Sequence, residues 1–211
     1  MTTTAETPIL YAHPASGFSY KPALAMGLMH LPYELRVVDI RRPRQERPAE
    51  FRDISTFGEV PVLLIDGLAI SQSNVILEYL ARRESRLHEG DESQRIRVRE
   101  WLSWEANRIG LNLAHARAAR TNGGYDPAVR AWYDGRTRAD LDHLDAVLAK
   151  RNFLVGDLVT IADIACVGYL YWADQAEIDI AHWPSVQAWL GRIAGLQGFR
   201  LPAAVFSGSA P

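Results

Sequence analysis

The chain has 211 residues, of which 48% are hydrophobic and 23% are charged, and its formal net charge is −2. This length allows one large or two modest domains, and the small net charge excludes a strong field for nucleic acid or anionic lipid. No apolar run approaches the roughly 18–20 residues of a membrane span, and the polar residues 1–8 lack the pattern of a secretory signal. The only cysteine is Cys166, which excludes a disulfide framework, a Cys-x-x-Cys pair and a cysteine-rich zinc site. We therefore expect a cytoplasmic protein with no metal, nucleic-acid or membrane partner.

Short strand-like and helix-like segments alternate over residues 1–83. The apolar residues alternate in some segments and recur at helical spacing in others, and Asp66-Gly67 is a typical hairpin turn. The resulting order is β-α-β, an irregular stretch, then β-β-α, which is the thioredoxin arrangement with a parallel first pair and an antiparallel second pair. The predicted elements are strands at residues 9–11, 33–37, 62–65 and 68–70, and helices at residues 20–30 and 71–83.

The remainder of the chain has a helical pattern. Residues 84–92 are charged and lack periodicity, which is typical of a linker. We predict an α/β domain at residues 1–83, a linker at 84–92 and an all-helical bundle domain at 93–211, with coil from Gly198 onward. The predicted helices of the second domain lie at residues 94–120, 127–151, 160–176 and 184–196.

Glu59-Val60-Pro61 stands where a strand begins. Proline has no N–H to donate to a strand ladder, so it is favoured at the first position of a strand. A cis peptide bond before Pro61 would turn the amide and carbonyl of Val60 outward, where they could pair with the backbone of a peptide ligand. A trans proline that only starts the strand is the alternative, and the dipeptide alone favours it.

Gln72-Ser73 stands at the start of a predicted helix. The first amides of a helix and its partial positive charge hold carboxylates, and the Ser73 hydroxyl would add a donor. A helix cap formed by Ser71 or Ser73 is the simpler alternative, and for the dipeptide alone it is favoured.

The loop at residues 13–19 contains Ser16 and Ser19 before a helix. A serine hydroxyl here could donate a hydrogen bond to a thiolate held at the helix N-terminus. Lowering a thiol pKa by ~2 units takes about 2.7 kcal/mol, which a charge-assisted hydrogen bond and a helix dipole can supply. The alternative role is a helix cap, which suits Ser19 better because it directly precedes the apolar helical pattern. A serine hydrolase is disfavoured because the chain lacks a Gly-x-Ser-x-Gly elbow.

Thr160-Ile161-Ala162-Asp163 opens an apolar segment and predicts a structural capping pair. Cys166, which follows among apolar residues, is expected to be a buried packing residue and not a nucleophile.

The serine loop, Val-Pro, Gln-Ser and Thr-x-x-Asp occur in one order along the chain. Together they resemble the glutathione transferase superfamily, from about residue 9 to residue 199. The loop His13-Pro14-Ala15-Ser16 looks like that of phi- and theta-type members, which implies that Ser16 is the catalytic serine. The run from Ser16 to Lys21 also looks like a bacterial subgroup with a cysteine at the place of Ser19, so Ser19 is the alternative thiol contact.

The resemblance also implies a glutathione site that includes Glu59. Val60 would pair with the cysteinyl backbone of glutathione through a cis Pro61, and Gln72 and Ser73 would hold the γ-glutamyl end. Arg47 belongs to a basic cluster, and such a cluster is usually part of a solvated loop. Beside a glutathione site, Arg47 would reach the glycine carboxylate. The chain departs from the family pattern at three places: Gln72 replaces an acidic residue, Glu59 stands where glutamine or lysine is common, and Ser55-Thr56 replaces Asn-Pro. A carboxylate at Glu59 could repel the glycine carboxylate.

The implied reaction is attack of the glutathione thiolate on a hydrophobic electrophile, as in detoxification. The alternatives are a glutathione-dependent disulfide reductase or peroxidase, and a non-enzymatic binding or regulatory member of the same fold. Family members are usually homodimers, which makes Phe57 a candidate to insert into the partner subunit. The resemblance implies a co-substrate pocket between the domains lined by Phe18, Trp104, Arg108, Leu111 and His115.

Overall fold

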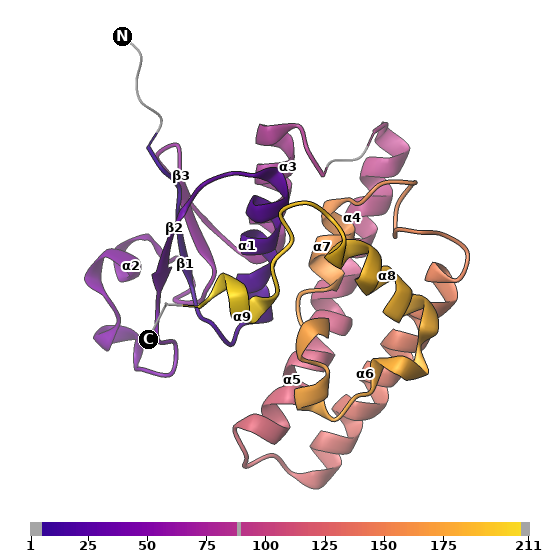
Figure 1. Ribbon diagram of the computed structural model, residues 1–211. Coiled ribbons are helices and arrows are strands. Elements are labelled where there is room, and N and C mark those ends of the chain that lie inside the picture. The colour runs from indigo at the N-terminus through magenta and orange to yellow at the C-terminus, as the bar shows by residue number, and fades with distance from the viewer. Residues whose placement is uncertain (1–5, 88–89, 208–211) are drawn as a thin grey trace. The chain divides into compact units, whose positions relative to one another are not determined.

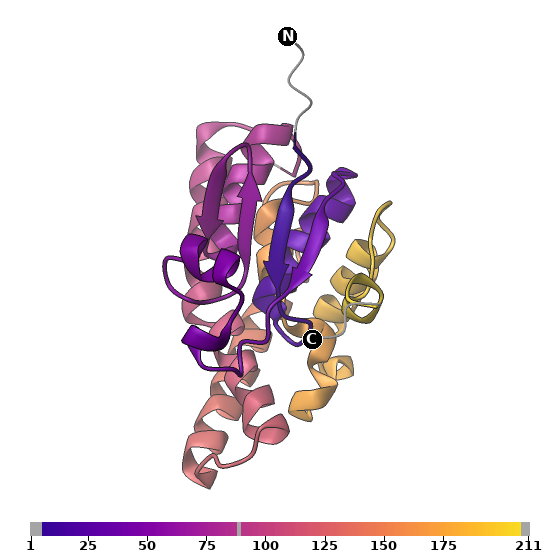
Figure 2. The same cartoon turned by 90° about the vertical axis from the view of Figure 1, so that its left-hand side faces the viewer.

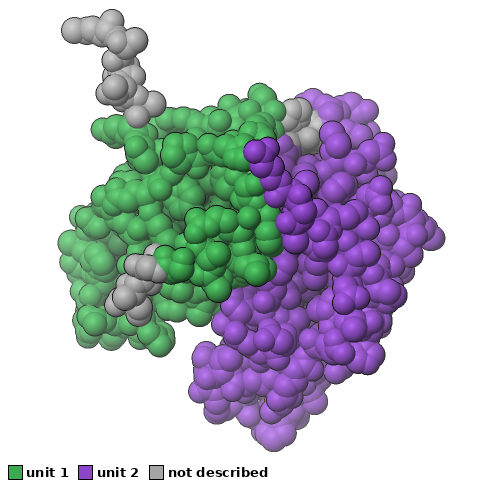
Figure 3. Space-filling view, in the orientation of Figure 1, with its two compact units in different colours: residues 1–86, 198–211 green, residues 87–197 purple. Residues whose placement is uncertain are grey.

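The computed structural model describes residues 6–87 and 90–207 (Figure 1). The chain divides into two compact units, one made of residues 1–86 and 198–211 and the other of residues 87–197 (Figure 3). The stretch from Gly198 is thus grouped with the first unit, which differs from the predicted division at residues 93–211. Most of the polar stretch at residues 1–8 and positions 88 and 89 of the predicted linker lie outside the described residues.

The first unit is built on a four-stranded sheet of order β2-β1-β3-β4 (Figure 2). β1 is parallel to β2, β3 is antiparallel to β1, and β4 is antiparallel to β3. This topology confirms the predicted thioredoxin-like arrangement. The strands are β1 (Ile9–Ala12), β2 (Glu34–Val37), β3 (Val62–Ile65) and β4 (Leu68–Ser71).

The sheet has an apolar layer on each face, because successive side chains of a strand point to opposite faces. Tyr11 and Val62 form a buried cluster with Phe51 of α2, whereas Leu10 and Leu63, which are paired across β1 and β3, belong to the opposite face. Helix α2 lies on one side of the sheet and helices α1 and α3 lie on the other (Figure 1). The helices of this unit are α1 (Gly17–Met29), α2 (Ala49–Ile54), α3 (Ser73–Glu84) and the short α9 (Pro202–Val205), with a 3-10 turn, η1, at Arg44–Glu46.

Two parts of this unit differ from the prediction. The stretch expected to be irregular contains α2, which buries Phe51 completely. The tail expected to be coil contains α9, and it is held to α1 by a hydrogen bond of 2.7 Å from the Tyr20 hydroxyl to the carbonyl of Arg200. Both short helices were missed because six or four residues are too few to show a helical period.

The second unit is helical, as predicted, but one predicted helix is interrupted and another ends ten residues early. The predicted helix 94–120 is interrupted at Arg108, whose φ of −125° and ψ of −108° are not helical. The predicted helix 160–176 ends at Cys166 and continues as 3-10 turns. That segment is almost entirely buried, and a uniformly apolar run has no period from which a helix end could be located. The helices are α4 (Glu92–Asn107), α5 (Ile109–Thr121), α6 (Pro127–Leu148), α7 (Ile161–Cys166) and α8 (Pro184–Ala194), with turns η2 (Leu170–Trp172), η3 (Asp174–Ala176) and η4 (Ile180–His182).

A glycine just after the break between α4 and α5 packs closely against a buried side chain. A Cβ atom added to Gly110 would lie 1.9 Å from Oε1 of Glu105, which is fully buried at the end of α4.

The predicted capping pair opens α7, where Thr160 and Asp163 form a complete capping box. Cys166 is buried, as expected. None of the described helices, within residues 6–87 and 90–207, has the length and apolar character needed to cross a membrane.

The backbone approaches itself closely within the first unit at Gly27 of α1 and Gly198 of the C-terminal stretch. A Cβ atom at Gly198 would lie 2.2 Å from the carbonyl oxygen of Gly27, and the φ of Gly198 is +87°. We therefore expect Gly198→Ala to lower the free energy of unfolding by about 2–3 kcal/mol, measured by urea denaturation. Gly67→Ala is the matched control, because Gly67 has a φ of +75° and open space around it. Equal losses in the two variants would contradict a close contact at Gly198.

Candidate active site

Three segments that the sequence singled out meet at one edge of the sheet. Tyr11 near the end of β1 is paired with Val62 at the start of β3, and Val62 is paired with Ser71 at the end of β4. The serine loop follows β1, Val60-Pro61 precedes β3, and Gln72-Ser73 follows β4. The strand register thus brings the three segments to the same place, which no single segment could specify.

The serine loop is closed by two hydrogen bonds to its hydroxyl groups. The Ser16 Oγ accepts from the Ser19 N–H at 3.1 Å and caps α1, and the Ser19 Oγ accepts from the His13 N–H at 3.1 Å. The expectation that Ser19 suits the cap role better is therefore wrong. The helix begins at Gly17, three residues before its apolar pattern, because a cap is set by backbone conformation and not by the first apolar side chain.

The two serines differ in accessibility. Each hydroxyl accepts a backbone N–H and therefore keeps its own proton to donate. Ser16 retains 6% of its surface and Ser19 retains none. Accessibility favours Ser16 as the donor to a bound thiolate, and this assignment stays a prediction.

The peptide bond between Val60 and Pro61 is cis, as the resemblance implied. The loop before it is fixed by Arg47, whose guanidinium donates to the carbonyls of Ile40 at 2.7 Å, Arg42 at 3.1 Å and Gly58. These contacts connect the two loops on either side of α2. A role of Arg47 at the glycine carboxylate stays a prediction. A guanidinium has five N–H donors, which is more than these three carbonyls occupy.

The N-terminus of α3 is formed by Gln72, which has a φ of +70° and makes no side-chain capping bond. Such a φ is uncommon for a residue other than glycine, and it is found where the surrounding structure imposes it. Neither Ser71 nor Ser73 caps this helix, so the capping alternative is wrong. The Nε2 of Gln72 donates to Oε2 of Glu59 at 3.4 Å.

Lys21 of α1 contacts the start of α3 at the candidate site, and the sequence pattern did not reveal it. Its side chain is 1% exposed, and its Nζ lies 3.5 Å from the Ser73 Oγ and 3.3 Å from the Asn74 Oδ1. The ammonium also lies 4.8 Å from the centre of the Phe18 ring, a cation–π distance. A buried cation therefore adds to the positive end of α3 at Ser73. The only signal in the sequence was a lysine inside an otherwise apolar helix.

The predicted co-substrate residues fall in both units, with Phe18 in the first and the others in the second. Trp104 packs against Trp101 and His143, with ring centres 5.2 and 5.4 Å apart. Leu111 of α5 is exposed.

Arg108 and His115 also engage residues of their own unit. The Arg108 Nε donates to the fully buried Asp140 at 2.7 Å, and His115 stacks on Tyr133 with ring centres 4.6 Å apart. That these five side chains line one pocket stays a prediction.

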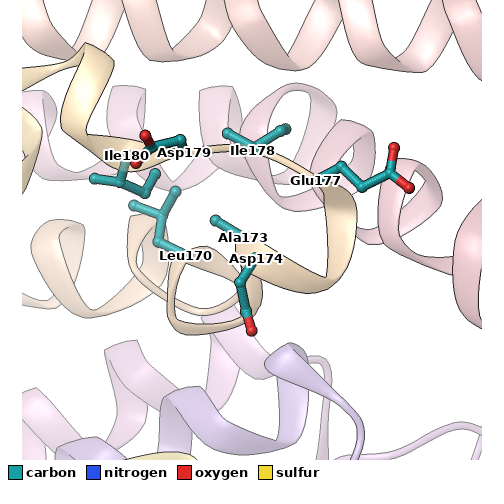
Figure 4. Close-up of a pocket in the computed structure, with 7 residues that line it drawn as sticks. All are labelled: Leu170, Ala173, Asp174, Glu177, Ile178, Asp179 and Ile180. Carbon is teal, nitrogen blue, oxygen red and sulfur yellow. The ribbon is translucent and has the colours of Figure 1, made fainter.

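A hollow of about 540 Å³ lies elsewhere in the second unit, around the turns that follow α7 (Figure 4). Its acidic Glu177 is held by Arg120 and Arg130 at 3.0 and 2.8 Å. None of the predicted co-substrate residues lines it. The lining residues are Leu170, Ala173, Asp174, Glu177, Ile178, Asp179 and Ile180.

The described residues contain no group of three or more His, Cys, Asp or Glu side chains that could hold a metal ion. What the site does offer, at one sheet edge, is a capped helix with a serine hydroxyl, the backbone of Val60 and the positive end of α3. This set suits a small peptide that carries a thiol and carboxylates.

Comparison with known proteins finds relatives that cover most of the chain. The chain is 26% identical to maleylacetoacetate isomerase of Rattus norvegicus over 199 residues, covering 92% of this chain and 91% of that protein. It is 29% identical to the disulfide-bond oxidoreductase YfcG of Escherichia coli (strain K12), covering 82% of this chain and 84% of that protein. The crystal structure of a glutathione S-transferase from Xanthobacter autotrophicus Py2 matches with a TM-score of 0.85 at 30% identity, covering 94% of this chain and 98% of that one.

Family models match both units. The model of the glutathione S-transferase N-terminal domain matches residues 15–83, which contain Ser16 and Ser19, the cis proline and the start of α3. The model of the C-terminal domain matches residues 127–197 of the helical unit. The two matches span more than half of the chain and the fold agrees with them, so the chain belongs to the glutathione S-transferase family.

Proposed function

We propose that this protein binds glutathione in its first unit and transfers the glutathione thiolate to a hydrophobic electrophile. The observation that carries the proposal is the convergence of Ser16, the cis Val60–Pro61 bond and the N-terminus of α3 at one sheet edge. The thiol would lie at the N-terminus of α1, where the Ser16 hydroxyl donates to the thiolate. Lowering the thiol pKa by ~2 units in this way requires about 2.7 kcal/mol.

The remaining groups of the glutathione molecule have partners in the same unit. The backbone of Val60 would pair with the cysteinyl residue. The α-carboxylate of the γ-glutamyl end would accept from the first amides of α3 and from the Ser73 hydroxyl, with the Lys21 ammonium behind it. Arg47 is the candidate for the glycine carboxylate. The electrophile would meet Phe18, Trp104, Arg108, Leu111 and His115.

Retention on immobilised glutathione tests the proposal, with circular dichroism as evidence that the protein is folded. We expect a folded protein that is retained, is eluted by free glutathione and conjugates glutathione to a haloaromatic acceptor. A folded protein that is not retained and shows no glutathione binding by calorimetry would exclude conjugation and every other function that depends on glutathione.

A glutathione-dependent disulfide reductase is the second candidate, favoured by the similarity to the oxidoreductase of Escherichia coli. The chain's only cysteine is buried, so glutathione itself would have to provide the thiol. Turnover of a mixed disulfide without turnover of the haloaromatic acceptor would favour this reaction.

The similarity to the rat enzyme adds isomerisation of maleylacetoacetate to the reactions to be assayed. A non-enzymatic member is favoured by the departures at Gln72 and Glu59, and glutathione binding without any turnover would support it.

We further propose that the protein is a homodimer and that Phe57 inserts into the partner subunit. Phe57 is 55% exposed, a high value for a large apolar side chain. Val75 of α3 and Ile96 of α4 are also half exposed. Light scattering would measure the molar mass of the protein in solution. The mass of a monomer would exclude the proposed homodimer. Location in the cytoplasm and a role in detoxification remain predictions.

A further inference from the structure

We propose that Glu59 binds the ammonium group of the γ-glutamyl end of glutathione and makes the site specific for a ligand with a free α-amino group. The inference rests on the proposed function. It assigns Glu59 to the opposite end of glutathione from the glycine carboxylate that the sequence pattern indicated.

The contact between Glu59 and Gln72 is the first observation. Glu59 precedes β3 and Gln72 follows β4, and the pairing of Val62 with Ser71 brings the two positions together. The Nε2 of Gln72 donates to Oε2 of Glu59 at 3.4 Å. The Gln72 amide therefore still has its Oε1 to accept a hydrogen bond, and the Glu59 carboxylate has its remaining lone pairs. The pair presents acceptors, and an ammonium group has three donors.

The charge around Ser73 is the second observation. The γ-glutamyl end of glutathione carries an ammonium and a carboxylate on the same carbon atom, so the two charges enter the site together. The helix N-terminus at Ser73 and the buried Lys21 ammonium attract the carboxylate, and they repel the ammonium. Binding both groups requires an anion close by. The Glu59 carboxylate is held by the residue that directly precedes Ser73, so it is placed to balance this positive charge.

The contacts of Arg47 support the same assignment. The loop carbonyl of Gly58 accepts from Arg47, whereas the side chain of the next residue, Glu59, contacts Gln72 at α3. The carboxylate is thus engaged on the side of the γ-glutamyl subsite. The two departures from the family pattern are then one rearrangement, in which the negative charge absent at position 72 is provided from position 59.

Calorimetric titration with two ligands tests the inference. The ligands are glutathione and its deamino analogue, glutaryl-cysteinyl-glycine, in which a hydrogen replaces the α-amino group. For the unmodified protein we expect the analogue to bind about five- to tenfold more weakly, the effect of one solvent-accessible charge-assisted hydrogen bond. Glu59→Gln should weaken glutathione binding by the same factor and leave binding of the analogue unchanged, so that the two affinities become equal.

Two further variants separate a local contact from a general effect of charge. Asp53→Asn removes an exposed carboxylate from α2 of the same unit and should leave both affinities unchanged. The double variant Glu59→Gln with Gln72→Glu returns a carboxylate to the other side of the contact and should restore the preference for glutathione. Circular dichroism of each variant reports folding.

The outcomes are distinguishable. If Glu59→Gln binds glutathione more tightly, Glu59 repels the glycine carboxylate and the assignment is wrong. If Glu59→Gln weakens both ligands equally, Glu59 does not contact the ammonium. If the unmodified protein binds neither ligand, the proposed function itself fails, and this inference fails with it.

Discussion

Replacing Asp163 with alanine is expected to lower the free energy of unfolding by about 3–5 kcal/mol. Asp163 is fully buried at the start of α7. Its carboxylate accepts from the N–H groups of Leu154, Thr160 and Trp189, each at 2.9 Å. The alanine variant would leave these three donors buried without an acceptor, and a buried unsatisfied donor costs about 1–3 kcal/mol.

Urea denaturation measures this loss, and Asp126→Ala provides the control. Asp126 caps α6 from an exposed position, where it accepts from the Ala128 N–H at 2.7 Å. Loss of such a cap costs about 1 kcal/mol. If Asp163→Ala costs no more than Asp126→Ala, then Asp163 acts only as a helix cap and does not join α7 to Leu154 and Trp189.

The same carboxyl group gives stability a pH dependence. Burial raises the pKa of Asp163 to about 6, against the opposing effect of hydrogen bonds from Thr160, Leu154 and Trp189. The unfolded chain releases this proton near the ordinary pKa of about 3.9, so between about pH 4 and pH 6 the folded state binds more protons. The contribution of Asp163 to stability should therefore decrease as the pH rises through this window and become constant above it.

Asp163→Asn tests this dependence, because an amide does not titrate. Subtracting the variant's stability from that of the unmodified protein at each pH should give a difference that falls between about pH 4 and pH 6. A difference that rises with pH over this interval would show that the hydrogen bonds outweigh burial and that the pKa is lowered.

Replacing Ser16 with alanine is expected to lower kcat/KM for glutathione conjugation by about 100-fold. Removing one hydrogen-bond donor that stabilises a negative charge in an active site usually has an effect of about this size. In the proposed site the Ser16 hydroxyl donates to the thiolate while accepting from the Ser19 N–H. Without that hydroxyl, the pKa of the bound glutathione thiol should rise by about 1–2 units, since one unit corresponds to about 1.36 kcal/mol. The pKa follows from ultraviolet absorbance of the thiolate at a series of pH values.

Two companion variants make the Ser16 result specific. Ser16→Ala also removes the cap of α1, a loss of about 1 kcal/mol of stability, so an activity loss has to be separated from partial unfolding. Ser16→Thr keeps a hydroxyl for both roles and should recover most of the activity and the low thiol pKa. Ser19→Ala should leave the thiol pKa nearly unchanged. Should Ser19→Ala abolish the reaction while Ser16→Ala leaves it intact, the assignment of the two serines is reversed.

Much of the first unit was predictable because its signals are local. Period-two alternation and the Asp66-Gly67 turn specify strands and a hairpin, and parallel pairing of the first two strands follows from the handedness of β-α-β crossovers. The capping box of α7 is equally local, since Thr160 and Asp163 are three residues apart. The site segments were recognised from their residue types and their order along the chain.

Features that depend on contacts between distant residues could not be predicted in this way. The break at Arg108 accompanies the packing of Gly110 against buried Glu105, although the sequence pattern continues through it. The grouping of the C-terminal stretch with the first unit reflects the approach of Gly198 to Gly27, far apart in the chain. Periodicity reports which face of one segment is apolar, and it carries no information on what covers that face.

The same distinction applies to the candidate active site. The fold class could be inferred from local patterns. The serine loop, the Val-Pro segment and the start of α3 were inferred as a site from their order along the chain and from the family resemblance, because the Val-Pro and Gln-Ser dipeptides alone favoured other roles. The burial of Lys21 beside Ser73 and the contact of Glu59 with Gln72 became visible in the folded protein. Lys21 reaches Ser73 from α1, and the register of β3 and β4 brings Glu59 to Gln72. The electrostatic balance at the start of α3 therefore depends on distances that no local pattern encodes.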